Sequence, residues 1–369
     1  MVLARRPMIM LLSGLALLAS CATQQQAWSR SGSGALIEPE PAASLGYATF
    51  WVRNLDIPSS QRIGAARLLD DLIVVVEQPS NVVYAVSVRD GSIRWRKVVG
   101  DPGEPLYSPV RAGDQLLVNS ATHLYILNAH TGELERIDSL AHVVSSGPVH
   151  IGPFVIFGDV KGRVFAHDIR AGFTKWSYQL TSNIAVPPVD AGQNQVLVAD
   201  ARGVYALLGA EDGQLVWRGR TFGPVTTRSA IDRLGVYIAS QDQTLYALAR
   251  PTGLDRWKFP TTYRQIGPPV VMGVSVYLPL GNEALVAINS ADGTERWRLP
   301  FGATPVTLRE EENRLLVRTP QSLKLIDAQT GQVVADAPTQ RLATVLTGPE
   351  GSLVLVAPNG RLMRLNPKR

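Results

Sequence analysis

The stretch YALARPTGLDRW, residues 246–257, decides the fold because its plan occurs seven times along the chain. Each copy has an aliphatic and aromatic run, a small polar turn that ends in glycine, and a position four residues later that is tryptophan in five copies. The turn glycines are Gly91, Gly132, Gly172, Gly213, Gly253, Gly293 and Gly331, separated by 41, 40, 41, 40, 40 and 38 residues. A fixed period of about 40 residues that carries strand signals is typical of the blades of a β-propeller.

Every period contains four strand signals, as a propeller blade requires. The first is a short segment built on Pro-Val, which occurs at 109–110, 148–149, 188–189, 269–270 and 305–306. Since proline donates no hydrogen bond to a sheet, we expect this segment on the edge strand nearest the propeller axis. An aliphatic strand and a strand with Tyr or Phe follow, and a tight turn whose glycine takes a positive φ leads into the fourth strand.

The repeated tryptophan lies on this fourth, outermost strand. It occurs as Trp95, Trp176, Trp217, Trp257 and Trp297. We expect each indole to wedge between adjacent blades and to donate its N–H to a neighbouring backbone carbonyl. A ligand-binding aromatic array is the alternative, and the outermost position disfavours it. Arg136 and Ala335 replace the tryptophan in two copies, which predicts looser packing at those two interfaces.

The ends of the repeat region predict how the ring closes. Residues 48–53 contain Trp51 and resemble a fourth strand with no first three before it, whereas 343–346, 353–356 and 362–365 supply three strands with no fourth after them. The N-terminal strand can therefore complete the last blade. We predict an all-β protein, with one eight-bladed β-propeller of four-stranded antiparallel blades over residues 47–369.

The first residues have the features of a secretory signal. A pair of arginines precedes a short apolar run, and residues 1–20 are interpreted as a signal peptide. Leu18-Ala19-Ser20-Cys21 resembles the lipobox of bacterial lipoproteins, which implies that Cys21 carries the lipid; an ordinary signal with a chance cysteine is the alternative. We expect residues 21–46 to be the lipidated cysteine and a flexible tether. In lipoproteins Asp after the cysteine favours the inner membrane, so Ala22 favours the outer membrane, with the protein facing the periplasm.

Composition excludes several other classes of function. Without the signal segment the formal charge falls from +5 to about +3, and the basic residues are scattered, which disfavours nucleic-acid binding. Cys21 is the only cysteine, so the chain forms no intrachain disulfide, CxxC redox pair or thiolate zinc site.

No catalytic, cofactor or metal site is predicted. The histidines, His123, His130, His142, His150 and His167, fall in two adjacent repeats but at five different positions of the repeat, whereas metal ligands must converge on one point. No GxSxG, HExxH, P-loop or Rossmann pattern occurs in a supporting context.

The Tyr-Ala-Leu run, the Thr-Gly or Asp-Gly turn and the tryptophan four residues on resemble the PQQ-like repeat, from about Tyr47 to the C-terminus. Together with the lipid anchor they resemble the BamB family of outer-membrane assembly lipoproteins. That resemblance implies a scaffold and not an enzyme, which works as a monomeric subunit of a hetero-complex, binds the periplasmic domains of BamA and supports insertion of outer-membrane β-barrels. Quinoprotein dehydrogenases share the repeat, but their cofactor pocket uses adjacent cysteines, and Cys21 stands alone.

Two connections depart from the family. BamB proteins commonly carry an exposed Leu-Ser-Leu-Arg type segment that contacts BamA, whereas here Leu180–Val186 is shorter and lacks the arginine. Arg220–Thr226 is also short and has none of the acidic residues that the family tends to place nearby. No partner-contacting residue is therefore carried over. The alternative function is a periplasmic propeller that binds a saccharide, lipid or peptidoglycan ligand, or another envelope complex.

Overall fold

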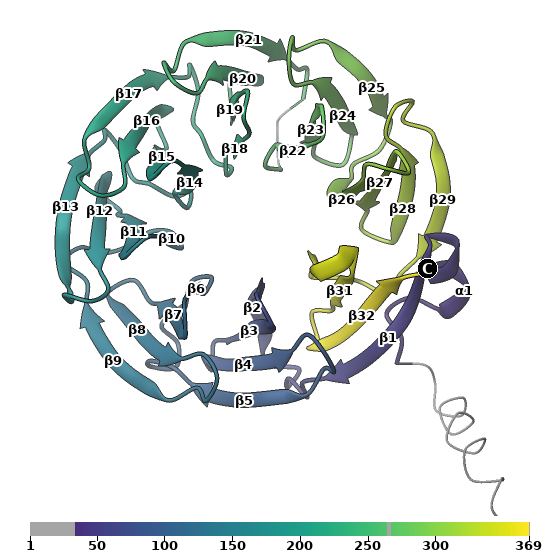
Figure 1. The fold of residues 1–369 in the computed structure, drawn as a ribbon, viewed down its shortest axis with the longest axis horizontal. Helices are drawn as coiled ribbons and strands as arrows, with labels where there is room; N and C mark the ends of the chain where they lie inside the picture. Colours follow the sequence, from purple (N-terminus) through teal and green to yellow (C-terminus); the bar gives the residue numbers. More distant parts are fainter. Residues whose placement is uncertain (1–33, 264–266, 369) are drawn as a thin grey trace, which may run out of the picture. The chain divides into compact units, whose positions relative to one another are not determined.

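The computed structural model describes residues 34–263 and 267–368, and these form eight four-stranded antiparallel sheets set in a ring (Figure 1). The expected signal peptide at 1–20, the lipid-attachment residue Cys21 and the first part of the expected tether lie outside the described residues. Among the described residues, no helix is long enough and apolar enough to span a bilayer. The predicted fold, an eight-bladed propeller of four-stranded antiparallel blades, is confirmed.

The blades are numbered here in ring order, each from its innermost to its outermost strand. Blades 1 to 4 are β2(Arg62–Leu69), β3(Leu72–Gln78), β4(Val82–Ser87), β5(Ile93–Val98); β6(Val110–Ala112), β7(Gln115–Asn119), β8(His123–Asn128), β9(Leu134–Ser139); β10(Val149–Ile151), β11(Phe154–Gly158), β12(Arg163–Asp168), β13(Phe173–Gln179); and β14(Val189–Gly192), β15(Gln195–Ala199), β16(Val204–Gly209), β17(Leu215–Arg220). Blades 5 to 8 are β18(Ala230–Ile231), β19(Gly235–Ser240), β20(Thr244–Ala249), β21(Asp255–Pro260); β22(Val270–Met272), β23(Ser275–Leu280), β24(Ala284–Asn289), β25(Glu295–Leu299); β26(Thr304–Arg309), β27(Arg314–Arg318), β28(Ser322–Asp327), β29(Val333–Pro338); and β30(Thr344–Thr347), β31(Leu353–Val356), β32(Arg361–Pro367), β1(Tyr47–Asn54).

The strands take the places that their residues predict. Each innermost strand is an edge of its sheet, and Pro109, Pro148, Pro188 and Pro269 stand immediately before such strands, where no ladder hydrogen bond is lost. The second and third strands of each blade are the most buried. Their side chains form apolar clusters that join neighbouring blades, so every blade depends on the next one for its core.

The tryptophan wedge is confirmed at every repeat that has the indole. Each Nε1–H donates to a backbone oxygen of the following blade, in the pairs Trp51–Val88, Trp95–Ala129, Trp176–Ala210, Trp217–Arg250, Trp257–Ser290 and Trp297–Ala328. The indole also covers the turn glycine of that blade, where an added Cβ would lie 2.5–2.9 Å from the ring. All of these glycines have a positive φ, so both the backbone and the neighbour require glycine.

The ring closes as predicted, by pairing of the first strand with the last. In the register of β1 and β32, Tyr47 stands opposite Pro367 and Asn54 opposite Arg361. Trp51 on β1 then wedges against blade 1, so this one strand completes blade 8 and contacts the blade after it. All eight blades therefore have four paired strands.

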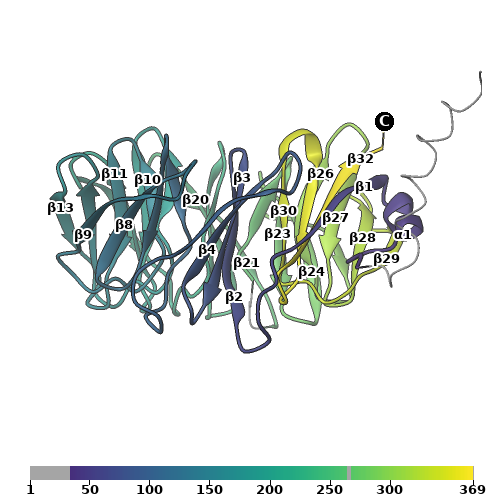
Figure 2. The ribbon, with the colours of Figure 1, turned by 90° about the horizontal axis from the view of Figure 1, so that it is seen from below.

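The expectation of a flexible tether over residues 21–46 is wrong for residues 36–46. The side chains of Leu36 and Leu45 are fully buried, and the short helix α1(Pro39–Ser44) packs against β1 and β29 (Figures 1 and 2). Ile37 bridges Thr339, and the backbone N–H of Leu36 donates to Met363 Sδ at 3.4 Å. The segment therefore joins blade 7 to blade 8.

Candidate interaction face

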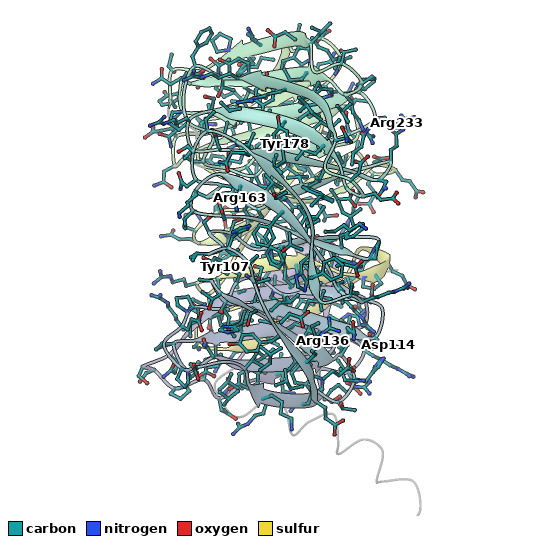
Figure 3. All side chains as sticks on the ribbon, turned by 90° about the vertical axis from the view of Figure 1, so that its left-hand side faces the viewer. Tyr107, Asp114, Arg136, Arg163, Tyr178 and Arg233 are labelled. Carbon is teal, nitrogen blue, oxygen red and sulfur yellow. The ribbon has the colours of Figure 1, made fainter. Side chains whose placement is uncertain are left out.

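The order of the strands divides the loops between two faces of the ring. One face, called here the connection face, carries the turns between second and third strands and the connections from each blade to the next. The other carries the first-to-second and third-to-fourth strand turns. Figure 3 shows Tyr107 and Arg163 at one edge of the ring, on the connection face, and Asp114 and Arg233 at the opposite edge. Figure 2 shows the ring edge-on.

Each connection is fastened to the blade that it leaves. In most blades the backbone N–H of the residue after the fourth strand donates to a carbonyl of the same blade's second-to-third strand turn; β25 is followed by Pro300, and there Gly302 N donates to Asn282 O. Examples are Leu180 to Gly162 at 2.8 Å, Thr221 to Gly203 at 2.9 Å and Thr261 to Gln243 at 2.7 Å. Because the same bond recurs, these connections start in a fixed direction although they contain no regular structure.

The connection Leu180–Val186 is held by the buried carboxylate of Asp200. Asp200 Oδ2 accepts from Thr181 N at 3.0 Å, Thr181 Oγ1 at 2.6 Å and Ser182 N at 3.1 Å, while Oδ1 accepts from Arg202 N and Val204 N at 2.9 Å. The aliphatic side chains of this connection, Leu180, Ile184 and Val186, are buried in the core between blades 3 and 4. This connection therefore presents no exposed leucine of the kind that the family resemblance implies.

Phe222, in the next connection, is the most exposed large apolar side chain among the described residues, at 92%. Its backbone is nevertheless fixed: Phe222 N donates to Asp242 Oδ2 at 3.0 Å, and Thr221 Oγ1 donates to Gly223 O at 2.6 Å. A Cβ on Gly223 would lie 2.5 Å from Asp242 N, so only glycine lets the connection approach blade 5 this closely. The ring of Phe222 thus points to solvent from an anchored loop.

Asp242 also organises the blade below Phe222. Its Oδ2 accepts the Tyr246 hydroxyl at 2.6 Å, and its Oδ1 accepts from Thr244 N at 3.1 Å. Burial, followed by the hydrogen bond to Asp242, raises the pKa of Tyr246 to about 12. The sequence interpretation found no acidic residue near this connection. Asp242, from the next blade, is an acidic residue that contacts this connection.

Other apolar side chains of the connection face are also exposed. Val143 and Val160 lie side by side, since Val160 N donates to Val143 O at 3.1 Å, and both side chains are about half exposed. Tyr263 lies on the connection after blade 5 and is 40% exposed. Blades 2 to 5 thus present several apolar groups on one face, as protein-binding surfaces do.

The histidines lie at separate sites and contact different partners. His167 and Asp138 are both buried, and His167 Nε2 lies 2.8 Å from Asp138 Oδ2. His142 contacts the guanidinium of Arg163, and His130 lies 3.3 Å from exposed Asp114. Within the residues that the structure describes, no three His, Cys, Asp or Glu side chains are grouped so that they could hold a metal ion.

Comparison with known proteins identifies related chains. A family profile described as outer membrane protein assembly factor BamB matches residues 22–186 and, a second time, residues 185–369. The chain is 28% identical over 203 residues to the outer membrane protein assembly factor BamB of Yersinia pestis, covering 50% of each chain. It is also 31% identical over 156 residues to the serine/threonine-protein kinase AfsK of Streptomyces griseus, covering 38% of this chain and 19% of the kinase. The chain thus spans half or less of the length of these curated relatives.

Two solved structures share the fold. BamB from Moraxella catarrhalis superimposes with a TM-score of 0.70 at 18% identity, over 87% of this chain and 99% of that one. The computationally designed protein Ika8 superimposes with the same TM-score at 13% identity, over 85% and 98%. At such identities the likeness shows the propeller architecture and nothing about what the face binds.

Proposed function

The chain belongs to the family of the outer membrane protein assembly factor BamB, and from this premise we propose that it is a non-catalytic scaffold that supports the assembly of β-barrel proteins in the outer membrane. Its partner in this proposal is a BamA-like barrel protein of the assembly machinery. The supporting facts are the family match over both halves of the chain and a propeller whose repeated residues all have a structural role.

The proposal includes attachment to the outer membrane by lipid on Cys21 after removal of residues 1–20. Acyl chains contribute about 0.8 kcal/mol for each buried CH₂, so several chains on one N-terminus would hold the protein firmly at the membrane surface. Because the folded unit begins at Leu36, the tether in this proposal is confined to residues 21–35. The propeller would then work in the periplasm, close to the membrane.

The observation that carries the scaffold proposal is the presentation of Phe222. An exposed aromatic ring on a fixed loop loses little conformational entropy when a partner covers it, and buried aromatic anchors dominate the energy of protein interfaces. Asp242 and Gly223 hold this loop against blade 5 through backbone contacts in which the ring of Phe222 takes no part. We therefore assign Phe222 as the central partner contact of the connection face.

Affinity capture of the native lipoprotein from membranes tests both parts of the proposal. Recovery of a BamA-like protein with other assembly factors supports the scaffold role, and recovery of no barrel-assembly protein would sink it. Phe222→Ala should reduce that recovery at least about tenfold. Phe173→Ala is the matched control, because Phe173 is 56% exposed but stands at the hairpin end of β13, away from the connection face. Equal recovery with both variants would show that Phe222 is not the partner contact, without contradicting the scaffold role.

A further inference from the structure

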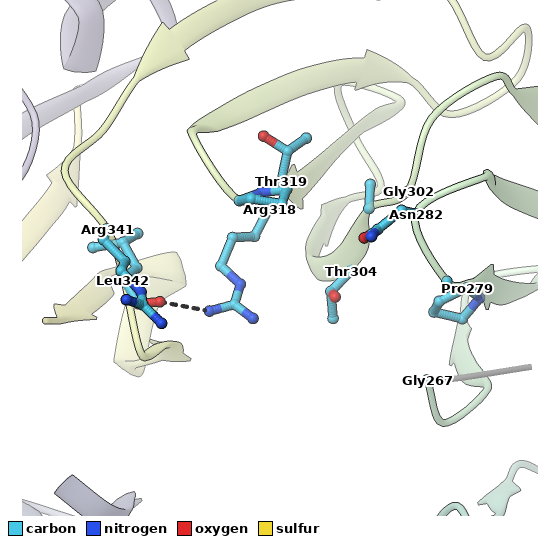
Figure 4. A pocket seen from close by; sticks show the side chains of 12 residues that line it. Gly267, Pro279, Asn282, Gly302, Thr304, Arg318, Thr319, Arg341 and Leu342 are labelled. Atoms are coloured by element: carbon cyan, nitrogen blue, oxygen red, sulfur yellow. Dashed lines mark hydrogen bonds between the residues drawn. The ribbon is translucent and has the colours of Figure 1, made fainter. Parts of the chain in front are cut away.

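A cavity of about 530 Å³ opens between blades 6 and 7 and the connection that leads to blade 8 (Figure 4). Phe222, on the connection from blade 4 to blade 5, does not line it. Arg318, the last residue of β27, and Arg341, in the connection after β29, both reach it. On the part of the wall that the structure describes, no aspartate or glutamate lines it.

Arg318 is held in place by backbone oxygens and not by a carboxylate. Its Nη1 donates to Leu342 O at 3.3 Å (Figure 4) and to Ala343 O at 2.9 Å. Burial lowers the pKa of Arg318, and no neighbouring carboxylate offsets that effect. Among the ion pairs of the described residues, neither Arg318 nor Arg341 takes part. The guanidinium is thus fixed, partly desolvated and without a counter-charge.

The rest of the wall offers neutral hydrogen-bonding groups on a rigid floor. Asn282 and Thr304 line the cavity with an amide and a hydroxyl, whereas the hydroxyl of Thr319, which also lines it, is bonded to Ser322. Gly302 N donates to Asn282 O at 2.9 Å, and a Cβ on Gly302 would lie 2.1 Å from Gly281 O, so two backbone segments pack directly on each other. Such a wall can orient the polar groups of a small ligand without having to be ordered first.

An adjoining cavity also contains a cation, but there the cation is paired with a carboxylate. It shares Asn282, Gly302 and Thr319 with the first and continues toward the outer rim, where Lys324 lies. There the cation has a partner, because Lys324 pairs with Asp336, and its ammonium also lies 5.5 Å from the centre of the Phe301 ring. Charge is therefore balanced at the outer rim and unbalanced at Arg318.

We propose that the Arg318 cavity binds the oxyanion, carboxylate or phosphate, of a small polar ligand. A guanidinium presents planar pairs of N–H groups that match two oxygens of such an anion, and the pair is strongest where water is partly excluded. Arg318, oriented by the carbonyls of Leu342 and Ala343, is the specific contact; Arg341 adds a second positive charge from the rim. This binding site is independent of the scaffold role proposed above, because it uses other blades and other residues.

Isothermal titration of the full-length protein at low ionic strength tests the proposal with three probes: inorganic phosphate, D-glucuronate and, as the neutral control, D-glucose. We expect saturable binding of at least one anion and none of glucose. Arg341→Gln and Arg318→Gln should each weaken binding at least about tenfold, which corresponds to one charge-assisted contact. Arg218→Gln, an equal change of charge at an exposed site on the outer strand β17, should leave it unchanged.

The outcomes separate the sources of the anion. Binding of phosphate alone identifies a phosphate ligand, and binding of glucuronate alone identifies a carboxylate ligand. The proposal is overturned if neither anion binds at millimolar concentration, or if Arg341→Gln binds as the unmodified protein does. Among the described residues the Arg341 side chain takes part in no hydrogen bond or ion pair, so that variant tests binding even if Arg318→Gln lowers stability.

Discussion

The guanidinium of Arg136 donates to the backbone oxygen of Ile169, at the place where six other interfaces have an indole N–H. Arginine thus keeps the hydrogen bond of the missing tryptophan. Asp138 pairs with the same guanidinium at 2.7 Å and with His167 at 2.8 Å, which makes this a polar version of an apolar interface. The nearest atoms to a Cβ on Gly172 are 3.8 Å away, in agreement with the expected looser packing.

Removing the wedge should therefore cost more where it is an indole. We predict that Trp257→Ala lowers the free energy of unfolding by about 3–5 kcal/mol through the cavity it leaves. Arg136→Ala should cost about 1–2 kcal/mol, because its side chain is 40% exposed and Asp138 keeps His167. Denaturant titrations of both variants measure the difference. Equal losses would mean that Arg136 packs as tightly as the tryptophans do.

The buried carboxylate of Asp200 should be a strong determinant of stability. It accepts five hydrogen bonds from two segments, the connection at Thr181 and Ser182 and the turn at Arg202 and Val204, and Asp200→Ala leaves those donors without a partner. A loss of about 3 kcal/mol or more in the free energy of unfolding is expected. Asp212→Ala removes an exposed turn carboxylate and serves as the control. A similar small loss in both variants would contradict the role of Asp200 in holding Leu180–Val186.

Gly223→Ala should act on binding as well as on stability. The added methyl group meets the backbone of Asp242, so the connection must move and Phe222 moves with it. We expect partner capture to fall with Gly223→Ala almost as far as with Phe222→Ala. Only the glycine variant should also lower the melting temperature, because the Phe222 side chain is almost fully exposed. A melting temperature that falls for Phe222→Ala would show that its ring stabilises the fold.

Alkaline pH should destabilise the propeller through its tyrosines. Burial first, with a neighbouring carboxylate also contributing, raises the pKa of Tyr84, Tyr237 and Tyr246 to about 12, above the value near 10 of an unfolded tyrosine. The folded state therefore holds these protons over a window in which the unfolded state has lost them. Their stabilisation is complete below pH 10 and is lost as the pH rises to 12. Urea titrations across this range should show the fall, and Tyr246→Phe should make it shallower; an unchanged slope would contradict the assignment.

The docked N-terminal segment should be needed for a stable interface between blades 7 and 8. Leu36→Ala removes a fully buried side chain and should cost about 2–4 kcal/mol, whereas Leu254→Ala, at a site 69% exposed, should cost little. Limited proteolysis of the native protein should cut before Leu36 and spare 36–46. Rapid cleavage inside α1 would show that this segment is not part of the folded unit.

The repeated residues made the fold predictable because the local geometry requires each of them. Gly253 has a positive φ and lies under Trp217, and either requirement alone would select glycine. Trp51 predicted the shared blade since it stood alone before the first complete repeat. The docking of Leu36 and Leu45 was not predictable, because the surrounding Gln, Ser, Gly, Ala and Pro form no apolar period. Their place is formed by two folded blades, since α1 packs against β29 of blade 7 and β1 of blade 8.

The candidate interaction face was predictable only in part. The sequence placed Arg220–Thr226 in a connection, but a phenylalanine between threonine and glycine looks the same whether it is buried or exposed. Its exposure depends on Asp242, 20 residues further on and in the next blade. In the preceding connection, from which no partner-contacting residue was carried over, Leu180 and Ile184 are buried by the fold. Neither outcome is encoded within the connection itself.

The pairing of β1 with β32 also sets an order of events. Thr49 on β1 pairs with Leu365 on β32, although the two residues lie near opposite ends of the domain sequence. β1, which is synthesised first, therefore has no partner until β32 has been synthesised. Loop closure over such a separation is slow compared with the formation of a local hairpin blade. Seven blades can thus form while the ring is still an open arc, and until then the chain exposes both the outer edge of β32 and the unpaired β1. Closure of the ring therefore depends on both ends of the domain at once.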